Sequence, residues 1–209
     1  MLKILDHRGY WKTPEEKNSL PALNKSLNQN RGIETDIRDC NGELVIAHNP
    51  ADALAPKLDA LLSAYSQLPQ KTLLALNVKA DGLYPLLSDI FNRYNVGFDD
   101  YFLFDMSLPE QYMYIKHGFS VFTRSSEFEP VPAFINECKG VWLDQFTDCN
   151  HIINNLPSYI KAGKIICVVS PELHSRPHEP LWEFLQKYRH NEKIYICTDK
   201  PDEAEAYFQ

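Results

Sequence analysis

Short apolar runs alternate with segments of helical spacing along the whole chain. The runs predict strands, and the segments between them predict helices, as the spacing of Leu20, Leu23 and Leu27 does after the first run. We expect the strands at residues 2–5, 33–37, 72–78, 101–104, 120–123, 141–143, 164–169 and 194–197. Strands that alternate with helices form parallel sheets, because each helix returns the chain to the start of the next strand. The pattern therefore indicates an α/β fold.

Eight strand–helix units predict a single (β/α)₈ TIM barrel. The 209 residues lie near the lower end of the length range of this fold, which is roughly 200 to more than 400 residues. A small β-hairpin is expected after the second strand, because Asn41-Gly42 is typical of a tight turn. A doubly wound open sheet is the competing fold, but no GxGxxG pattern follows the first strand. No linker or change of composition divides the chain, which predicts one domain over residues 1–209.

Composition, net charge and cysteine spacing exclude several classes of protein. The 21 Lys and Arg against 28 Asp and Glu give a net charge of −7, which argues against a nucleic-acid partner. No apolar run approaches the roughly 18 residues of a membrane span, and the first residues do not resemble a signal peptide. The five cysteines form no C-x-x-C pair. We expect a reduced, cytoplasmic protein without membrane insertion, and the oligomeric state stays open.

Acidic residues lie on one face of the second predicted strand. Glu34 and Asp36 are two residues apart, so both point into the predicted barrel, where an uncompensated charge is costly. Asn77 ends the third strand and could supply a neutral oxygen, although a hydrogen-bonded core amide is an equal alternative. Oxygen ligands of this kind suit a hard divalent cation. The sequence therefore predicts a site for one hard divalent cation at Glu34, Asp36 and Asn77.

Histidines and cations follow the same strand ends, where a (β/α)₈ barrel carries its chemistry. His7 and Arg8 follow the first strand, His48 follows the hairpin and Lys79 follows the third strand. Histidines exchange protons near neutral pH, and the two cations suit an anionic ligand. Together with a divalent cation, this set suits displacement at a small-molecule phosphodiester.

The same residues carry a resemblance to a known family. Four segments resemble motifs of the glycerophosphodiester phosphodiesterase family, namely its HRG, PENT, E-x-D and hairpin motifs. They are His7-Arg8-Gly9, Asn18-Ser19-Leu20, Glu34-Thr35-Asp36 and the segment from Asn41-Gly42 to His48. The Leu76–Lys79 strand and the Thr198–Asp202 segment are similar to two further motifs of that family. The resemblance is clear over the first three strands and present at the last one, and little similarity is found between them.

The resemblance implies a fold, a site and an activity. The fold is a TIM barrel like that of phosphatidylinositol phospholipase C, and the activity is metal-dependent hydrolysis of glycerol-type phosphodiesters, a reaction of lipid metabolism. His7 and His48 would be the general base and the general acid. Arg8 and Lys79 would bind the phosphate, and Glu34, Asp36 and Asn77 would hold one Mg²⁺ or Ca²⁺.

One departure from the family keeps two alternatives open. The family has a glutamate at the position of Asn77, and loss of a ligand charge weakens cation binding. A non-catalytic phosphate-binding barrel with a decayed metal site is therefore an alternative to an enzyme. A sphingomyelinase-D-like lyase shares the histidines and the acids, but it would be secreted and disulfide-bonded.

Other polar residues have simpler interpretations. His174 and His178 are four residues apart, but Pro177 lies between them and would break a helix. We expect both histidines in a surface loop.

Overall fold

The computed structural model describes all residues 1–209, in two compact units. One unit is Asp6–Val121, and the other joins Met1–Leu5 to Phe122–Gln209. Strand β1 (Lys3–His7) contributes residues to both units. The expectation of one domain over residues 1–209 stays a prediction.

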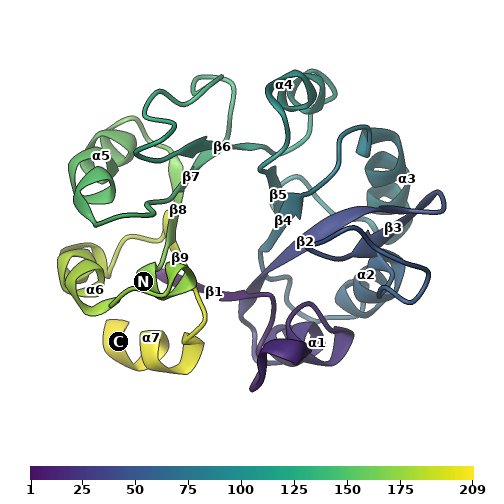
Figure 1. The fold of residues 1–209 in the computed structure, drawn as a ribbon, viewed down its shortest axis with the longest axis horizontal. Coiled ribbons are helices and arrows are strands. Elements are labelled where there is room, and N and C mark those ends of the chain that lie inside the picture. Colours follow the sequence, from purple (N-terminus) through teal and green to yellow (C-terminus); the bar gives the residue numbers. More distant parts are fainter. The chain divides into compact units, whose positions relative to one another are not determined.

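The Asp6–Val121 unit contains a parallel sheet in the order β5-β4-β2, with β3 antiparallel to β2. Figure 1 shows helices α2 and α3 beside the β2–β3 hairpin. The strands are β2 (Gly32–Cys40), β3 (Glu43–Ile46), β4 (Leu74–Val78) and β5 (Tyr101–Phe104). The helices are the 3₁₀ turn η1 (Pro14–Glu16), α1 (Leu20–Asn28), α2 (Leu58–Ser66), α3 (Tyr84–Tyr94) and α4 (Leu108–Lys116).

The hairpin forms where the sequence predicts it. Asn41 and Gly42 have φ values of 52° and 80°, the left-handed conformation that a two-residue hairpin turn of type I′ requires at both central positions. Asparagine and glycine adopt this conformation most readily. The turn sets the register in which Ile37 lies opposite Ile46.

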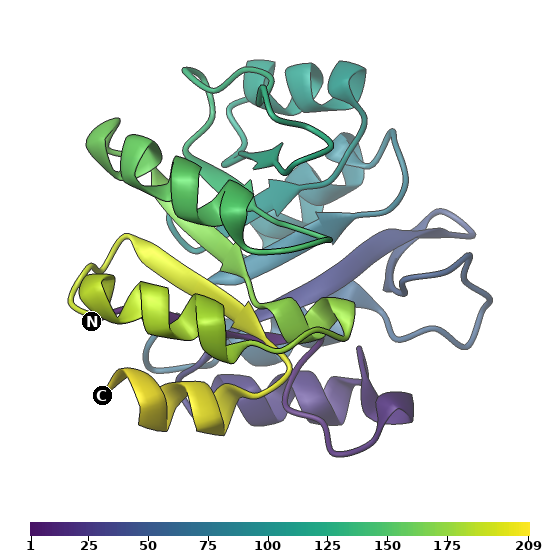
Figure 2. The ribbon, with the colours of Figure 1, turned by 60° about the vertical axis from the view of Figure 1, so that its left-hand side comes forward.

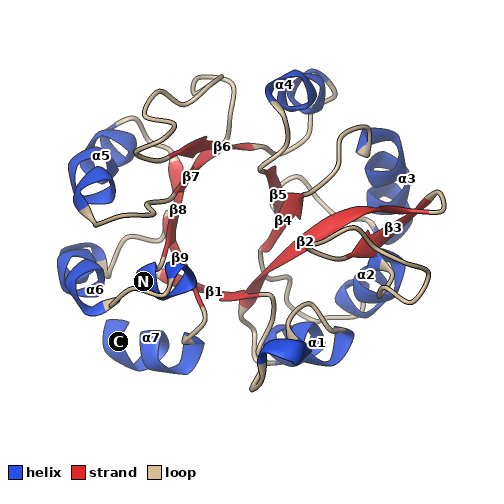
Figure 3. Ribbon diagram, in the orientation of Figure 1, coloured by secondary structure: helices blue, strands red, loops and turns tan.

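The Phe122–Gln209 unit contains a second parallel run of strands, in the order β9-β8-β7-β6. Figure 2 shows α5, α6 and α7 along one side of β8 and β9, and Figure 3 shows the same helices in blue beside red strands. The strands are β6 (Phe122–Ser125), β7 (Gly140–Leu143), β8 (Ile165–Val169) and β9 (Ile194–Thr198). The helices are α5 (Asn150–Lys161), η2 (Pro171–His174), α6 (Glu179–Leu185), η3 (Gln186–Tyr188) and α7 (Pro201–Phe208).

This second unit has a continuous apolar core. Leu156 of α5, Trp182 of α6 and Phe208 of α7 are buried in one cluster with apolar residues of β7, β8 and β9. Apolar burial of this kind contributes roughly 25 cal/mol per Å², which explains why the helices lie against the strands.

All eight predicted strands are present, with small shifts of their ends. The largest shift of a single end is three residues, at the second strand, which was expected to end at residue 37 and ends as β2 at Cys40. The fifth strand was expected at residues 120–123 and begins as β6 at Phe122. The preceding residues join the sheet only through an isolated parallel bridge between Val121 and Leu103. None of the helices combines the length and the apolar character needed to cross a lipid bilayer.

Candidate active site

The carboxyl half of β2 carries the two predicted acidic ligands. Glu34 and Asp36 are 2% and 0% exposed, and the intervening Thr35 is also buried, so both faces of the strand are covered. Asp36 lies opposite Asn77 in the parallel pairing of β2 with β4. Paired positions on neighbouring strands point to the same face, so the register places Asn77 beside the two acids.

The end of β1 brings His7 and Arg8 to these acids. The backbone N–H of Arg8 donates to the carbonyl of Glu34 at 2.9 Å. The His7 Nε2 atom lies 3.8 Å from Oε2 of Glu34, and the Arg8 Nε atom lies 2.8 Å from Oδ2 of Asp36. Gly9 follows with a φ of 85°, and a side chain there would come within 2.7 Å of backbone atoms in α1. The turn after β1 is therefore tight against α1.

Lys79 approaches Asp36 from the end of β4. Its backbone N–H donates to the carbonyl of Ile37 at 2.8 Å, which continues the pairing of β4 with β2. The ammonium Nζ lies 3.5 Å from Oδ1 of Asp36 and 2.9 Å from Oδ2 of Asp105. Asp36 therefore has two cations beside it, Arg8 and Lys79.

His48 is the last of the seven predicted site residues, and its side chain is exposed. The backbone N–H of Ala47 donates to the carbonyl of Asp36 at 3.1 Å, so the chain leaves β3 beside Asp36. The His48 ring lies 2.9 Å from the side-chain oxygen of Asn49. No hydrogen bond or ion pair links this ring to the other six predicted residues.

Two further residues contact the predicted set and were not predicted as site residues. The Asn18 amide donates to Oδ2 of Asp36 at 2.8 Å and accepts from the Thr35 hydroxyl at 2.7 Å. Asp105 follows β5 directly and binds the Lys79 ammonium. Asn18 belongs to a segment that the family resemblance includes, and Asp105 stands at a strand end, so both positions carried a usable signal.

Glu34 has an unusual environment for an acid. Burial, followed by the neighbouring charge of Asp36, raises the pKa of Glu34 to about 8 from an ordinary value of 4.5. Arg8, Lys79 and the Asn77 side chain act in the opposite direction but do not compensate. A carboxyl group of this kind gains greatly from a nearby cation, because the cation favours its charged form.

The predicted ligand set fits a divalent cation. Glu34, Asp36 and Asn77 each present one buried side-chain oxygen that has no hydrogen-bond partner, namely Oε2, Oδ1 and Oδ1. Buried oxygens without a partner are costly, and hard divalent cations bind oxygens of this type. No group of three or more His, Cys, Asp or Glu side chains is placed to hold a metal. The predicted set contains only two acids, and its third residue is an amide.

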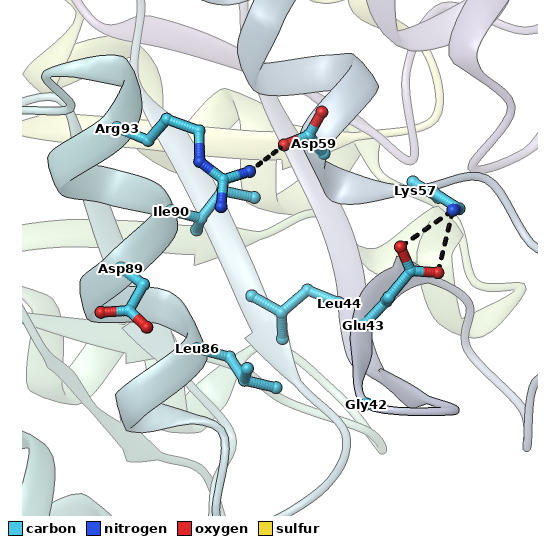
Figure 4. A pocket seen from close by; sticks show the side chains of 9 residues that line it. All are labelled: Gly42, Glu43, Leu44, Lys57, Asp59, Leu86, Asp89, Ile90 and Arg93. Carbon is cyan, nitrogen blue, oxygen red and sulfur yellow. Dashed lines mark hydrogen bonds and ion pairs between the residues drawn. The ribbon is translucent and has the colours of Figure 1, made fainter.

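A separate cavity of about 360 Å³ lies in the same unit, lined by residues of β3, α2 and α3 (Figure 4). None of the seven predicted residues lines it. Two ion pairs line it, Lys57 with Glu43 at 2.9 Å and Arg93 with Asp59 at 2.7 Å, and Asp89 is a further charged group in its lining. The cavity is therefore separate from the predicted site.

The expectation of a surface loop for both distant histidines was wrong for His178. This residue is 5% exposed, its ring packs on Trp182 at 4.1 Å, and Nε2 lies 3.0 Å from Glu203. Pro177 does keep the pair out of one helix, because α6 begins only at Glu179. His174 is partly buried and lies 2.8 Å from Asp144. Apolar packing on a tryptophan explains the burial that spacing alone did not predict.

Comparisons with solved structures match nearly the whole chain. A glycerophosphodiester phosphodiesterase from Agrobacterium tumefaciens matches with a TM-score of 0.69 at 17% identity, over 99% of both chains. A glycerophosphoryl diester phosphodiesterase from Parabacteroides distasonis matches with a TM-score of 0.70 at 13% identity, over 99% of this chain and 86% of that one. This chain has the fold of the glycerophosphodiester phosphodiesterases.

A third structure with this fold is a phosphodiesterase from Oleispira antarctica in complex with its product sn-glycerol-3-phosphate. It matches with a TM-score of 0.69 at 14% identity, over 98% of this chain and 96% of that one. No protein-family model matches the chain, and no curated protein sequence does.

The matches confirm the predicted fold class. The sheet follows the order β5-β4-β2-β1-β9-β8-β7-β6, with β3 on β2, which is the strand succession of a (β/α)₈ fold. The family resemblance that the sequence motifs indicated is thus confirmed at the level of the fold.

Proposed function

We propose that this chain is a metal-dependent phosphodiesterase that hydrolyses a glycerophosphodiester-like or related small phosphodiester. The observation that carries the proposal is the contact network around Asp36 and Glu34, which includes six of the seven predicted residues. The fold shared with phosphodiesterases supports the same reaction class.

Charge neutralisation is the first task of the proposed site. Glu34, Asp36 and Asn77 would hold one Mg²⁺ or Ca²⁺, which when bound would offset negative charge on the phosphate. Arg8 uses Nε toward Asp36, and a guanidinium keeps further N–H donors for phosphate oxygens. Lys79 would add a compact positive charge to the same group. These cations would stabilise the charge that develops in the transition state.

Proton transfer is the second task. His7 would accept a proton from the attacking water while the oxygen of that water forms a bond to phosphorus. His48 would then protonate the leaving oxygen as its bond to phosphorus breaks, which releases an alcohol and a phosphomonoester. If the attacking group is a hydroxyl of the substrate rather than water, the first product is a cyclic phosphate.

Hydrolysis assays test this proposal. Purified protein is incubated with bis(p-nitrophenyl) phosphate and with glycerophosphodiesters, with Mg²⁺, Ca²⁺ or Mn²⁺ and with EDTA. We expect turnover that needs a cation, and release of glycerol phosphate from the natural-type substrates. Phosphorus NMR of the products separates direct hydrolysis from cyclic-phosphate formation, the product expected of a lyase. Absence of turnover under every condition would contradict the enzymatic proposal.

Asn77 favours one alternative, a barrel that binds phosphate without catalysis. Its amide contributes an oxygen but no charge, which lowers the expected cation affinity relative to a carboxylate. The Asn77→Glu variant separates the two functions. New activity together with tighter cation binding in this variant, from a silent wild type, would favour the decayed-site alternative.

A further inference from the structure

The Lys79 ammonium stands between two carboxylates and donates a hydrogen bond to only one of them. It donates to Oδ2 of Asp105 at 2.9 Å, whereas Oδ1 of Asp36 lies 3.5 Å away. This Asp36 oxygen is buried and has no hydrogen-bond partner. The ammonium is therefore hydrogen-bonded to Asp105 and forms only a longer ion pair with the fully buried Asp36.

Asp105 is held in place by its backbone and by its loop. Its φ is 73°, a left-handed conformation that aspartate and asparagine adopt more readily than most residues. The loop after β5 is also tied to the loop after β4. The Ser107 hydroxyl donates to Asp81 at 2.6 Å, and the Gly82 N–H donates to Glu110 at 2.9 Å. The Lys79–Asp105 pair is thus one of three residue pairs that join the loop after β4 to the loop after β5 and the first turn of α4.

The position of the ammonium decides what Asp36 can bind. Oδ2 of Asp36 already has Arg8 Nε at 2.8 Å and the Asn18 amide at 2.8 Å. If Lys79 also donated to Oδ1, both oxygens of this carboxylate would be occupied by donors. A cation would then have to displace a buried ion pair, which lowers its affinity.

We propose that Asp105 is a positioning residue that keeps the Lys79 ammonium away from Oδ1 of Asp36, so that this oxygen stays available to a divalent cation. This role rests on the cation of the proposed function. It assigns to Asp105 an effect that acts through Lys79 and requires no contact with the cation or the substrate.

A double-mutant cycle on cation binding tests the proposal. Isothermal titration with Mn²⁺ alone compares wild type, Asp105→Asn, Lys79→Met and the double variant at one pH. Asparagine tolerates the left-handed backbone, so Asp105→Asn is expected to fold, and thermal unfolding checks this. We expect Asp105→Asn to weaken Mn²⁺ binding at least fivefold in wild type and less than twofold in the Lys79→Met background.

A matched charge control completes the design. Asp89→Asn removes one negative charge from the exposed face of α3 in the same unit and is expected to leave Mn²⁺ binding unchanged. Equal losses from Asp105→Asn in both backgrounds would indicate a direct charge effect and overturn the proposal. Unchanged binding in Asp105→Asn would overturn it as well.

The outcome is separable from that of the proposed function. If the wild-type protein binds no Mn²⁺ but hydrolyses phosphodiesters, the role of Asp105 is overturned. The chain is then still a phosphodiesterase, but one that does not depend on a metal. Conversely, the expected coupling in a protein without turnover supports the role of Asp105 while the enzymatic function fails.

Discussion

The Asn18 amide joins the buried carboxylate of Asp36 to its neighbour on the strand, donating to Asp36 at 2.8 Å and accepting from the Thr35 hydroxyl at 2.7 Å. Asn18 itself has a φ of 62° and donates its backbone N–H to the carbonyl of Arg8 at 3.0 Å. One side chain therefore links the loop before α1 to β2 and orients a predicted ligand.

Replacing Asn18 by alanine tests this link. We expect Asn18→Ala to lower the free energy of unfolding by about 1–3 kcal/mol, because the buried Thr35 hydroxyl loses its acceptor and Oδ2 of Asp36 loses one of its two neighbouring donors. Urea denaturation measures the change. Asn92→Ala, on the exposed side of α3, is the control and should have little effect. A loss no larger than that of the control would contradict the link.

The ion pair between Arg31 and Asp6 should be essential to the stability of the Asp6–Val121 unit. The Arg31 Nε atom lies 3.0 Å from Asp6, whose carboxylate is 0% exposed. Removing one partner leaves a buried charge, so Arg31→Met should destabilise by about 3–5 kcal/mol. Arg93→Met breaks the exposed pair with Asp59 and should change stability by less than about 1 kcal/mol. Similar losses in both variants would refute the assignment.

Gly9 should not tolerate a side chain. A Cβ there would lie 2.7 Å from backbone atoms of Ala22 and Leu23, and the φ of 85° disfavours any residue but glycine. Gly82→Ala is a matched control, since Gly82 has a φ of 84° and open space around the same position. We expect the control to lose about 1–2 kcal/mol from backbone strain alone. Gly9→Ala should lose clearly more in thermal unfolding, and equal losses would show that the steric contact yields.

The two predicted proton-transfer residues should each affect turnover. His7→Ala and His48→Ala are expected to lower kcat by roughly 10²–10⁴-fold, the effect of losing a general acid or base. His190→Ala, at an exposed position, is the control. Steady-state kinetics on the best substrate from the hydrolysis assays measures the effect. Full activity in both single variants would remove the histidines from the mechanism.

Stability of the cation-free protein should depend on the ionisation of Glu34. Its pKa is about 8 in the folded chain and near 4.5 when unfolded, so the folded state binds the additional proton between these values. The contribution of Glu34 to stability is therefore present below about pH 4.5, falls as pH rises toward 8, and is absent above it. One proton corresponds to a slope of at most about 1.4 kcal/mol per pH unit.

Comparison of wild type with Glu34→Gln isolates this slope, because other titrating groups affect both proteins. Urea denaturation in EDTA from pH 5 to 8 should show wild type losing stability relative to the variant. The exposed Glu43→Gln is the control, and its difference from wild type should not follow the same course. A constant difference between wild type and Glu34→Gln would contradict the raised pKa.

The amino-acid sequence by itself determined the order of strands and helices and the strand ends at which the candidate site residues lie. Apolar runs separated by helical spacing predicted all eight parallel strands, and Asn41-Gly42 predicted the hairpin, because these are local preferences of the backbone. The period of two placed Glu34 and Asp36 on one face. Only the tertiary structure decided which side chains contact one another. The pairing of Lys79 with Asp105, the contact of Asn18 with Asp36 and the burial of His178 on Trp182 all depend on distances between elements far apart in sequence. Such contacts are set by packing and by strand register, which no local pattern of residues contains.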